Sequence, residues 1–231
     1  MTPLVLIPGM MCDARLYGPQ ITAIEADRDV LVLPITESDT VEALAESVLR
    51  AAPDRFALAG LSMGGIVAME VIRQAPARVE RLALMDTNAA PESEAVSKAR
   101  EPQIARVRAG KLRAVMRDEL KPMYLADGPD REALLAICME MAMDLGPDVF
   151  ERQSRALQTR PDQREALRRV AVPTLVLCGA DDRLCPVHRH EVIRDLIDGA
   201  TLQIVDDAGH MPTLEQPETV KAALLHWLTI S

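Results

Sequence analysis

Aromatic side chains are scarce in this sequence and make up only 2% of its 231 residues. Hydrophobic residues still account for 48% of the chain, so its core must consist of aliphatic side chains and of the 12 methionines. A ligand pocket in such a core offers little aromatic surface for stacking. The length is typical of one large domain and is sufficient to bury a full core.

Long apolar runs and metal-binding motifs are also missing. No apolar run approaches the roughly 18 residues that cross a membrane, and the start MTPLVLIPGM lacks the features of a signal peptide. The four cysteines form no CxxC pair, and no histidine lies at metal-ligand spacing from them. We therefore expect free thiols, a cytoplasmic location, and neither a metal nor another cofactor.

Clusters of positive charge are the third absence. The net charge is -9, and the one basic stretch, residues 164–169, is interrupted by Glu165, Ala166 and Leu167, which is typical of a solvated helix face. This pattern argues against nucleic acid as a partner. We expect a small-molecule substrate and a monomer or homodimer that does not bind membranes.

Six short apolar runs, each ended by turn residues, alternate with amphipathic segments. Such runs are typical of strands buried on both faces of a parallel sheet. They cover residues 4–7, 30–33, 56–59, 82–85, 174–178 and 202–205. Helices are predicted over residues 41–52, with Thr40 as N-cap, and over 66–74, 186–197 and 217–228. This alternation predicts an α/β fold with helices on both faces of the sheet.

Residues 90–169 interrupt this alternation because they contain no strand-like run. Prolines and glycines, among them Pro102 and Gly146-Pro147, divide the segment into what we predict to be several short helices. Its methionines are consistent with ordinary core or with a pliable apolar pocket. We therefore predict a core formed by residues 1–89 and 170–231, with residues 90–169 inserted as a helical cap.

The sequence Gly60-Leu61-Ser62-Met63-Gly64 is a G-x-S-x-G motif. It directly follows the predicted strand 56–59 and precedes a predicted helix, which is the context in which this motif places a serine on a sharp turn. A plain glycine-rich turn is the alternative. Ser62 is therefore the candidate nucleophile, and it needs a base to accept its proton.

Four histidines could supply that base. His188 and His190 lie among charged residues and are interpreted as solvated, whereas His226 lies inside the last predicted helix. His210 follows the last predicted strand in a loop, and parallel sheets place catalytic groups at the carboxyl ends of their strands. His210 is the candidate base.

An acid must orient that imidazole, and three aspartates follow predicted strands: Asp86, Asp181 and Asp182. The chain resembles the α/β-hydrolase superfamily over essentially its whole length. The stretch from Gly179 through Asp182 to Pro186 is similar to the family's acid-bearing loop, and Gly209-His210 is similar to its histidine loop. The resemblance selects Asp182, with Asp86 as the backup acid.

The resemblance also implies an α/β-hydrolase fold with a trimmed, mostly parallel sheet of six strands in the order 2-1-3-4-5-6. The oxyanion would be bound by the backbone N–H groups of Met63 and Met10. Pro8-Gly9 stands before Met10 where the family often has His-Gly, so a plain turn is the alternative there.

The implied function is a serine hydrolase that cleaves a carboxylic ester or thioester of a small to medium apolar acyl compound through an acyl-enzyme on Ser62. Lactonases, C–C bond hydrolases and acyltransferases use the same triad and remain alternatives. A non-catalytic small-molecule binding protein is an alternative of another class, because fold alone permits it.

Overall fold

Six parallel strands form one sheet in the computed structural model, which describes residues 1–230. The strands are β1 (Leu4–Ile7), β2 (Val30–Val32), β3 (Phe56–Leu61), β4 (Val79–Met85), β5 (Thr174–Gly179) and β6 (Thr201–Val205). Their order is β2-β1-β3-β4-β5-β6, and every neighbouring pair is parallel. The predicted strand number, order and direction are confirmed.

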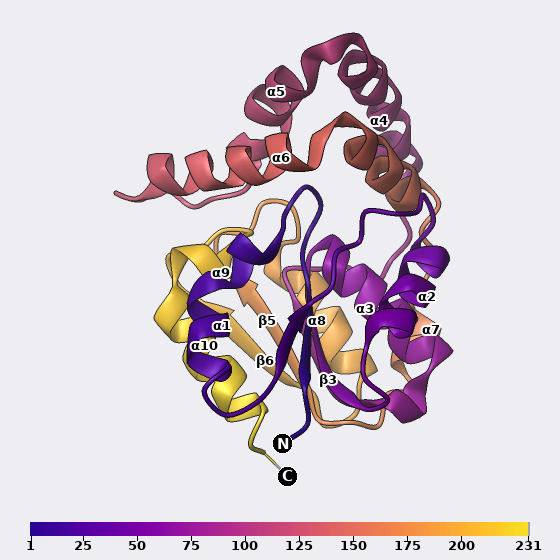
Figure 1. The fold of residues 1–231 in the computed structure, drawn as a ribbon, viewed down its shortest axis with the longest axis vertical. Coiled ribbons are helices and arrows are strands. Elements are labelled where there is room, and N and C mark those ends of the chain that lie inside the picture. The colour runs from indigo at the N-terminus through magenta and orange to yellow at the C-terminus, as the bar shows by residue number, and fades with distance from the viewer. Residues whose placement is uncertain (231) are drawn as a thin grey trace.

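Helices cover both faces of the sheet (Figure 1). One face packs against α1 (Gly18–Ile24) and α10 (Pro217–Trp227), and the other against α2 (Val41–Ala51), α3 (Met63–Gln74) and α8 (Val187–Leu196). Within β1, Leu4 and Leu6 belong to the first core, whereas Val5 and Ile7 belong to the second. Alternate residues of a strand thus build two cores on opposite faces of one sheet.

The helix boundaries agree with the expected ones to within a few residues, apart from α1, which was not expected. As predicted, Thr40 caps α2, where its hydroxyl accepts a hydrogen bond from the Ala43 amide. The other short elements are α9 (Pro212–Glu215), η1 (Ala14–Tyr17), η2 (Pro76–Arg78), η3 (Val107–Lys111), η4 (Met116–Leu120) and η5 (Lys121–Met123).

The two outer strands differ from the expected burial on both faces. All six residues of β3 are buried, but every residue of β2 is only half-buried. In β6, Thr201 and Ile204 are exposed. An edge strand has a neighbour on one side only, so the expectation of full burial is wrong for β2 and β6.

Between β4 and β5 the chain is helical, as predicted. It forms α4 (Glu94–Arg106), α5 (Leu112–Val115), α6 (Arg131–Gln158) and α7 (Arg164–Leu167), and Figure 1 shows α4, α5 and α6 stacked above the sheet. The expected break at Gly146 is a kink with φ of 80°, but α4 continues through Pro102, so the predicted break there is wrong.

The division into a core and an inserted cap stays a prediction, and its last residue, Ser231, lies outside the described part of the chain. Within residues 1–230, none of the helices combines the length and the apolar character needed to cross a bilayer.

We expect Gly179→Ala to destabilise the fold. A Cβ at this position would lie 2.0 Å from the Gly209 carbonyl oxygen and 2.3 Å from that of Ala208, and backbone atoms cannot move aside cheaply. The free energy of unfolding, measured with urea, should fall by about 2 kcal/mol or more. Gly128→Ala is the control, because a Cβ there meets nothing within 4 Å. Equal stability of both variants would contradict this account of the close approach.

Candidate active site

Ser62 lies on the turn between β3 and α3, with φ of 57° and ψ of -117°. A positive φ is strained for a residue with a side chain, and such strain is concentrated at functional sites. The flanking glycines permit the turn: a Cβ on Gly60 would lie 2.3 Å from the Gly64 carbonyl oxygen, and one on Gly64 would lie 2.0 Å from that of Ile7. The turn therefore holds the serine hydroxyl out at the carboxyl end of the sheet.

His210 lies between Ser62 and Asp182. Its Nε2 is 2.8 Å from Ser62 Oγ, and its Nδ1 is 2.8 Å from Asp182 Oδ2. The loop is held from the helical segment, because the His210 amide donates to the Tyr124 carbonyl oxygen at 2.7 Å. An ionised carboxylate only accepts hydrogen bonds, so we assign the proton to Nδ1 and leave Nε2 to accept from the Ser62 hydroxyl.

Asp182 is buried in the loop after β5, and both of its carboxylate oxygens take part in hydrogen bonds. Its Oδ1 accepts hydrogen bonds from the amides of Leu184 and Cys185 at 2.8 and 2.9 Å. Burial by itself would raise the pKa of Asp182, but the imidazole of His210 and these two amides lower it below its usual value. The carboxylate therefore stays ionised and can stabilise an imidazolium.

Asp86, the backup acid, makes a different contact. It follows β4, and its Oδ1 accepts from the Gly179 amide at 2.9 Å, whereas Asp182 is the carboxylate bonded to His210. Burial and the negative charge of Asp182 raise the pKa of Asp86 well above its usual value, which favours a neutral carboxyl. Its φ of 44° places it on a strained turn as well.

Glu215 is a positioning residue that the sequence reasoning did not single out. Its carboxylate accepts hydrogen bonds from the amides of Gly209, Met211 and Ala126, at distances between 2.7 and 3.0 Å. It thereby joins both flanks of His210 to the helical segment. The sequence held a signal, because Glu215 is the first acidic residue after the candidate base His210.

His190 is not solvated, so that expectation is wrong. Its side chain is fully buried on the inner side of α8, and its Nε2 accepts from the Thr87 amide at 2.9 Å. The Thr87 hydroxyl in turn donates to the Ser62 carbonyl oxygen at 2.7 Å. Burial lowers the pKa of His190 to about 4, so the imidazole is neutral. His188 and His226 are exposed.

A cavity of about 540 Å³ opens onto Ser62 and His210, and Met10 and Met63 also line it. Met63 is the first residue of α3, and amides in the first turn of a helix have no acceptor within that helix. Both predicted oxyanion residues therefore border the space in which a substrate carbonyl would lie. Their role as oxyanion donors stays a prediction.

One group of side chains in residues 1–230 has the spacing of a metal site. Donor atoms of Asp182, Cys185 and His210 lie within 4.8 Å of one another. Burial raises the pKa of the Cys185 thiol, so the thiolate that a metal prefers is disfavoured. Asp182 and His210 are also bonded to each other. The donor set fits a hydrogen-bonded triad better than a metal site.

We expect Asp182→Asn to lower kcat for ester hydrolysis about ten-thousandfold, because an amide would hold His210 in the wrong tautomer. Asp86→Asn is the matched control. Its amide oxygen can still accept from Gly179, and the raised pKa of Asp86 already favours an uncharged side chain, so kcat should fall by less than about tenfold. Steady-state kinetics on a p-nitrophenyl ester measures both, and the reverse order of effects would identify Asp86 as the acid.

His190 should make stability depend on pH in acid. Its pKa is about 4 in the native state and 6.5 when solvated, so below pH 6.5 the unfolded chain binds a proton that the native state does not. Neutral His190 therefore contributes fully to the free energy of unfolding above pH 6.5. About 3 kcal/mol of this free energy is lost as the pH falls toward 4.

His190→Gln tests this, because a glutamine oxygen can accept from Thr87 but does not titrate. Urea unfolding between pH 7 and 4 should give a flatter stability profile for the variant than for the wild type. Parallel profiles would contradict a buried, neutral imidazole.

Relatives with assigned activities match most of the chain. A pimeloyl-[acyl-carrier protein] methyl ester esterase from Aromatoleum aromaticum is 28% identical over 78% of this chain and 76% of its own length. A putative carbamate hydrolase from Yersinia enterocolitica is 24% identical over 97% of this chain and 86% of its own.

Solved structures agree with the fold. A thermophilic esterase from Thermogutta terrifontis superposes with a TM-score of 0.90 at 26% identity, covering 99% of this chain and 89% of its own. The enol-lactonase from Burkholderia xenovorans gives a TM-score of 0.89 at 22% identity, with coverage of 99% and 92%. The model of the alpha/beta hydrolase family matches residues 4–223. The chain belongs to the alpha/beta hydrolase family.

Proposed function

We propose that this protein is a serine hydrolase that cleaves carboxylic esters through an acyl-enzyme on Ser62. The observation that carries the proposal is the unbroken hydrogen-bonded chain from Ser62 Oγ through His210 to Asp182, with both links at 2.8 Å. A serine is a weak nucleophile until a base can take its proton. Here His210 is the base, and Asp182 orients it.

In the acylation step, Ser62 Oγ attacks the ester carbonyl carbon while His210 Nε2 takes the hydroxyl proton. The carbonyl oxygen becomes an oxyanion, which the backbone amides of Met10 and Met63 bind. When the intermediate collapses, the carbon–oxygen bond to the alcohol breaks. The leaving alcohol takes the proton from His210, and the acyl group stays on Ser62.

Deacylation repeats these steps with water. His210 Nε2 removes a proton from a water molecule, which attacks the acyl carbon. Collapse of the second oxyanion returns the proton to Ser62 Oγ and releases a carboxylic acid. Asp182 stays ionised throughout and stabilises the imidazolium each time it forms. The reaction needs no cofactor, because protons move only among Ser62, His210, the substrate and water.

The relatives support the choice of ester as the bond that is cleaved. The Aromatoleum protein is named as a methyl ester esterase and the Thermogutta protein as an esterase. An enol-lactone is a cyclic ester, so the Burkholderia name fits the same chemistry. Thioesters and lactones would react by the same steps on Ser62.

The test is labelling of the purified protein with a fluorophosphonate, followed by intact-mass measurement. Wild type should gain one phosphonyl group, and Ser62→Ala should gain none. Ser93→Ala is the matched control, because Ser93 lines the same cavity but its hydroxyl caps α4, accepting from the Val96 amide. This variant should be labelled like the wild type and should hydrolyse p-nitrophenyl butyrate.

Two outcomes would contradict the proposal. Labelling of Ser62→Ala would mean that another residue is the activated nucleophile. A folded wild type that is neither labelled nor active on p-nitrophenyl esters would favour a small-molecule binding protein on this fold.

A further inference from the structure

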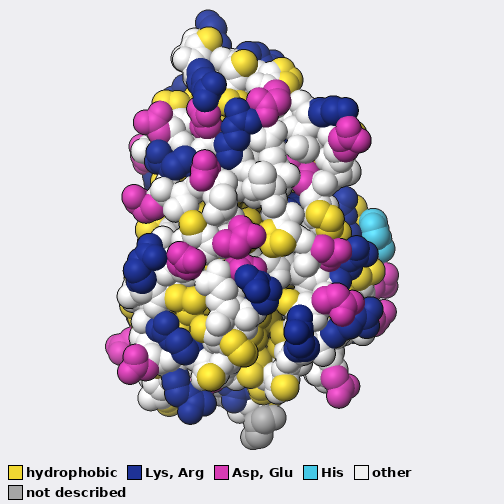
Figure 2. Space-filling model, turned by 90° about the vertical axis from the view of Figure 1, so that its right-hand side faces the viewer, with side chains coloured by type: hydrophobic (Ala, Val, Ile, Leu, Met, Phe, Trp, Pro, Cys, Tyr) yellow, Lys and Arg dark blue, Asp and Glu magenta, His cyan; other side chains and the backbone are white. Residues whose placement is uncertain are grey.

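The cavity beside Ser62 has a charge opposite to that of the whole protein. The chain has a net charge of -9, and Figure 2 shows acidic and basic side chains interspersed on the face that it displays. The cavity lining instead contains five arginines and a single acidic residue, Glu92. The arginines are Arg100, Arg160, Arg164, Arg183 and Arg189.

Two of these arginines share the one glutamate. Arg100 donates to the Glu92 carboxylate from Nε and Nη2 at 2.7 and 2.8 Å. Arg160 Nη1 lies 4.0 Å from the same carboxylate. All three side chains are largely buried, with exposed fractions of 13% for Arg100, 11% for Arg160 and 3% for Glu92. The group therefore carries two positive charges and one negative charge away from bulk solvent.

Arg160 is the member of this group with unused binding capacity. Its Nε donates to the Ala90 carbonyl oxygen at 3.1 Å, and within residues 1–230 its two Nη groups make no hydrogen bond. Burial lowers the pKa of Arg160, because desolvation is unfavourable for the cation and Glu92 compensates only in part. A carboxylate bound to the Nη groups would remove this penalty, since guanidinium and carboxylate match in shape and charge.

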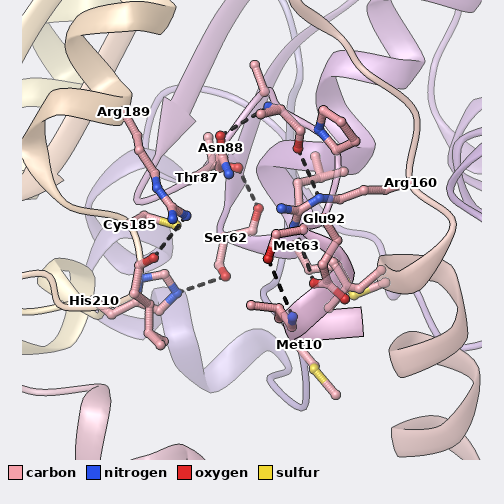
Figure 3. A pocket seen from close by; sticks show the side chains of 18 of the residues that line it. Met10, Ser62, Met63, Thr87, Asn88, Glu92, Arg160, Cys185, Arg189 and His210 are labelled. Atoms are coloured by element: carbon pink, nitrogen blue, oxygen red, sulfur yellow. Dashed lines mark hydrogen bonds and ion pairs between the residues drawn. The ribbon is translucent and has the colours of Figure 1, made fainter. Parts of the chain in front are cut away.

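The position of Arg160 indicates which part of a substrate would reach it. In Figure 3, Arg160 and Glu92 lie on the opposite side of Ser62 from His210 and Arg189. The leaving alcohol must be near His210, because His210 protonates it. The acyl portion then extends to the other side, toward Arg160.

We propose that the acyl portion of the substrate ends in a carboxylate, which Arg160 binds with the support of Arg100. The substrate is then the half-ester of a short dicarboxylic acid, of a size that a cavity of about 540 Å³ can enclose. This inference rests on the proposed ester hydrolysis at Ser62, and it adds the class of acyl group.

The kinetic test compares two esters that differ only at the far end of the acyl chain. These are the mono-p-nitrophenyl ester of adipic acid, which carries a terminal carboxylate, and p-nitrophenyl hexanoate, which does not. For the wild type, kcat/KM should be at least about tenfold higher for the adipate ester, as expected for a charge-assisted hydrogen bond. Hydrolysis of both esters with equal kcat/KM would overturn the inference while leaving the proposed function intact.

Substitutions of single arginines identify the side chain that binds the terminal carboxylate. Arg160→Gln should reduce the adipate-to-hexanoate ratio of kcat/KM about tenfold, and Arg160→Lys should retain part of the preference. Arg113→Gln removes the same charge from an exposed position outside the cavity and should leave the ratio unchanged. Arg189→Gln changes the cavity on the alcohol side and should affect the ratio less than Arg160→Gln. A ratio that falls with Arg189→Gln but not with Arg160→Gln would overturn the assignment.

A binding experiment separates failure of this inference from failure of the proposed function. Titration calorimetry on Ser62→Ala needs no turnover and compares monomethyl adipate with dimethyl adipate. The monoester should bind at least about tenfold more tightly, and adding Arg160→Gln should abolish the difference. Equal affinities would overturn the inference even if the esterase activity is established. If the protein prefers the monoester but hydrolyses no ester, the carboxylate site at Arg160 is supported and the proposed ester hydrolysis is not.

Discussion

The hydrogen bond between Asp182 and His210 is the interaction on which the rest of the site depends, because it determines which imidazole nitrogen faces Ser62. Amides of the loop after β5 hold the carboxylate, and burial there excludes the water that would otherwise compete for it. The His210 amide donates to the Tyr124 carbonyl oxygen, and the amides on either side of His210 donate to Glu215. Residues from the sheet edge and from the helical segment thus position one ring.

Buried polar groups that do not contact the Ser62 hydroxyl stabilise the backbone at Ser62. Neutral His190 accepts from the Thr87 amide, and the Thr87 hydroxyl bonds to the Ser62 carbonyl oxygen. Asp86, whose raised pKa favours an uncharged carboxyl, accepts a hydrogen bond from the Gly179 amide, and the imidazole is bonded to Asp182. Thr87 and His190 favour one conformation of the strained turn, since relaxation of the turn would break the hydrogen bond between Thr87 and Ser62. The pKa shifts therefore favour an ionised Asp182 beside uncharged forms of Asp86 and His190.

The sequence predicted the parts of this structure that local patterns determine. Apolar runs marked all six strands, and the glycines around Ser62 marked the turn. Helix α1 was not predicted. His190 was assigned to the surface because its neighbours in the sequence are charged, but in α8 its side chain is buried, as is that of Ile193. The group of Glu92, Arg100 and Arg160 could not be predicted from the sequence, because Arg160 is distant in the chain from Glu92 and Arg100 and only packing brings it to them.

A covalent acyl-enzyme on Ser62 can be trapped during turnover. The protein would be mixed with excess p-nitrophenyl ester, quenched in acid within milliseconds, digested and mapped by mass spectrometry. The peptide containing Ser62 should be heavier by the mass of the acyl group, and this adduct should decay when the ester is exhausted. Turnover without any acylated peptide, or an acyl group on a different residue, would contradict an acyl-enzyme on Ser62.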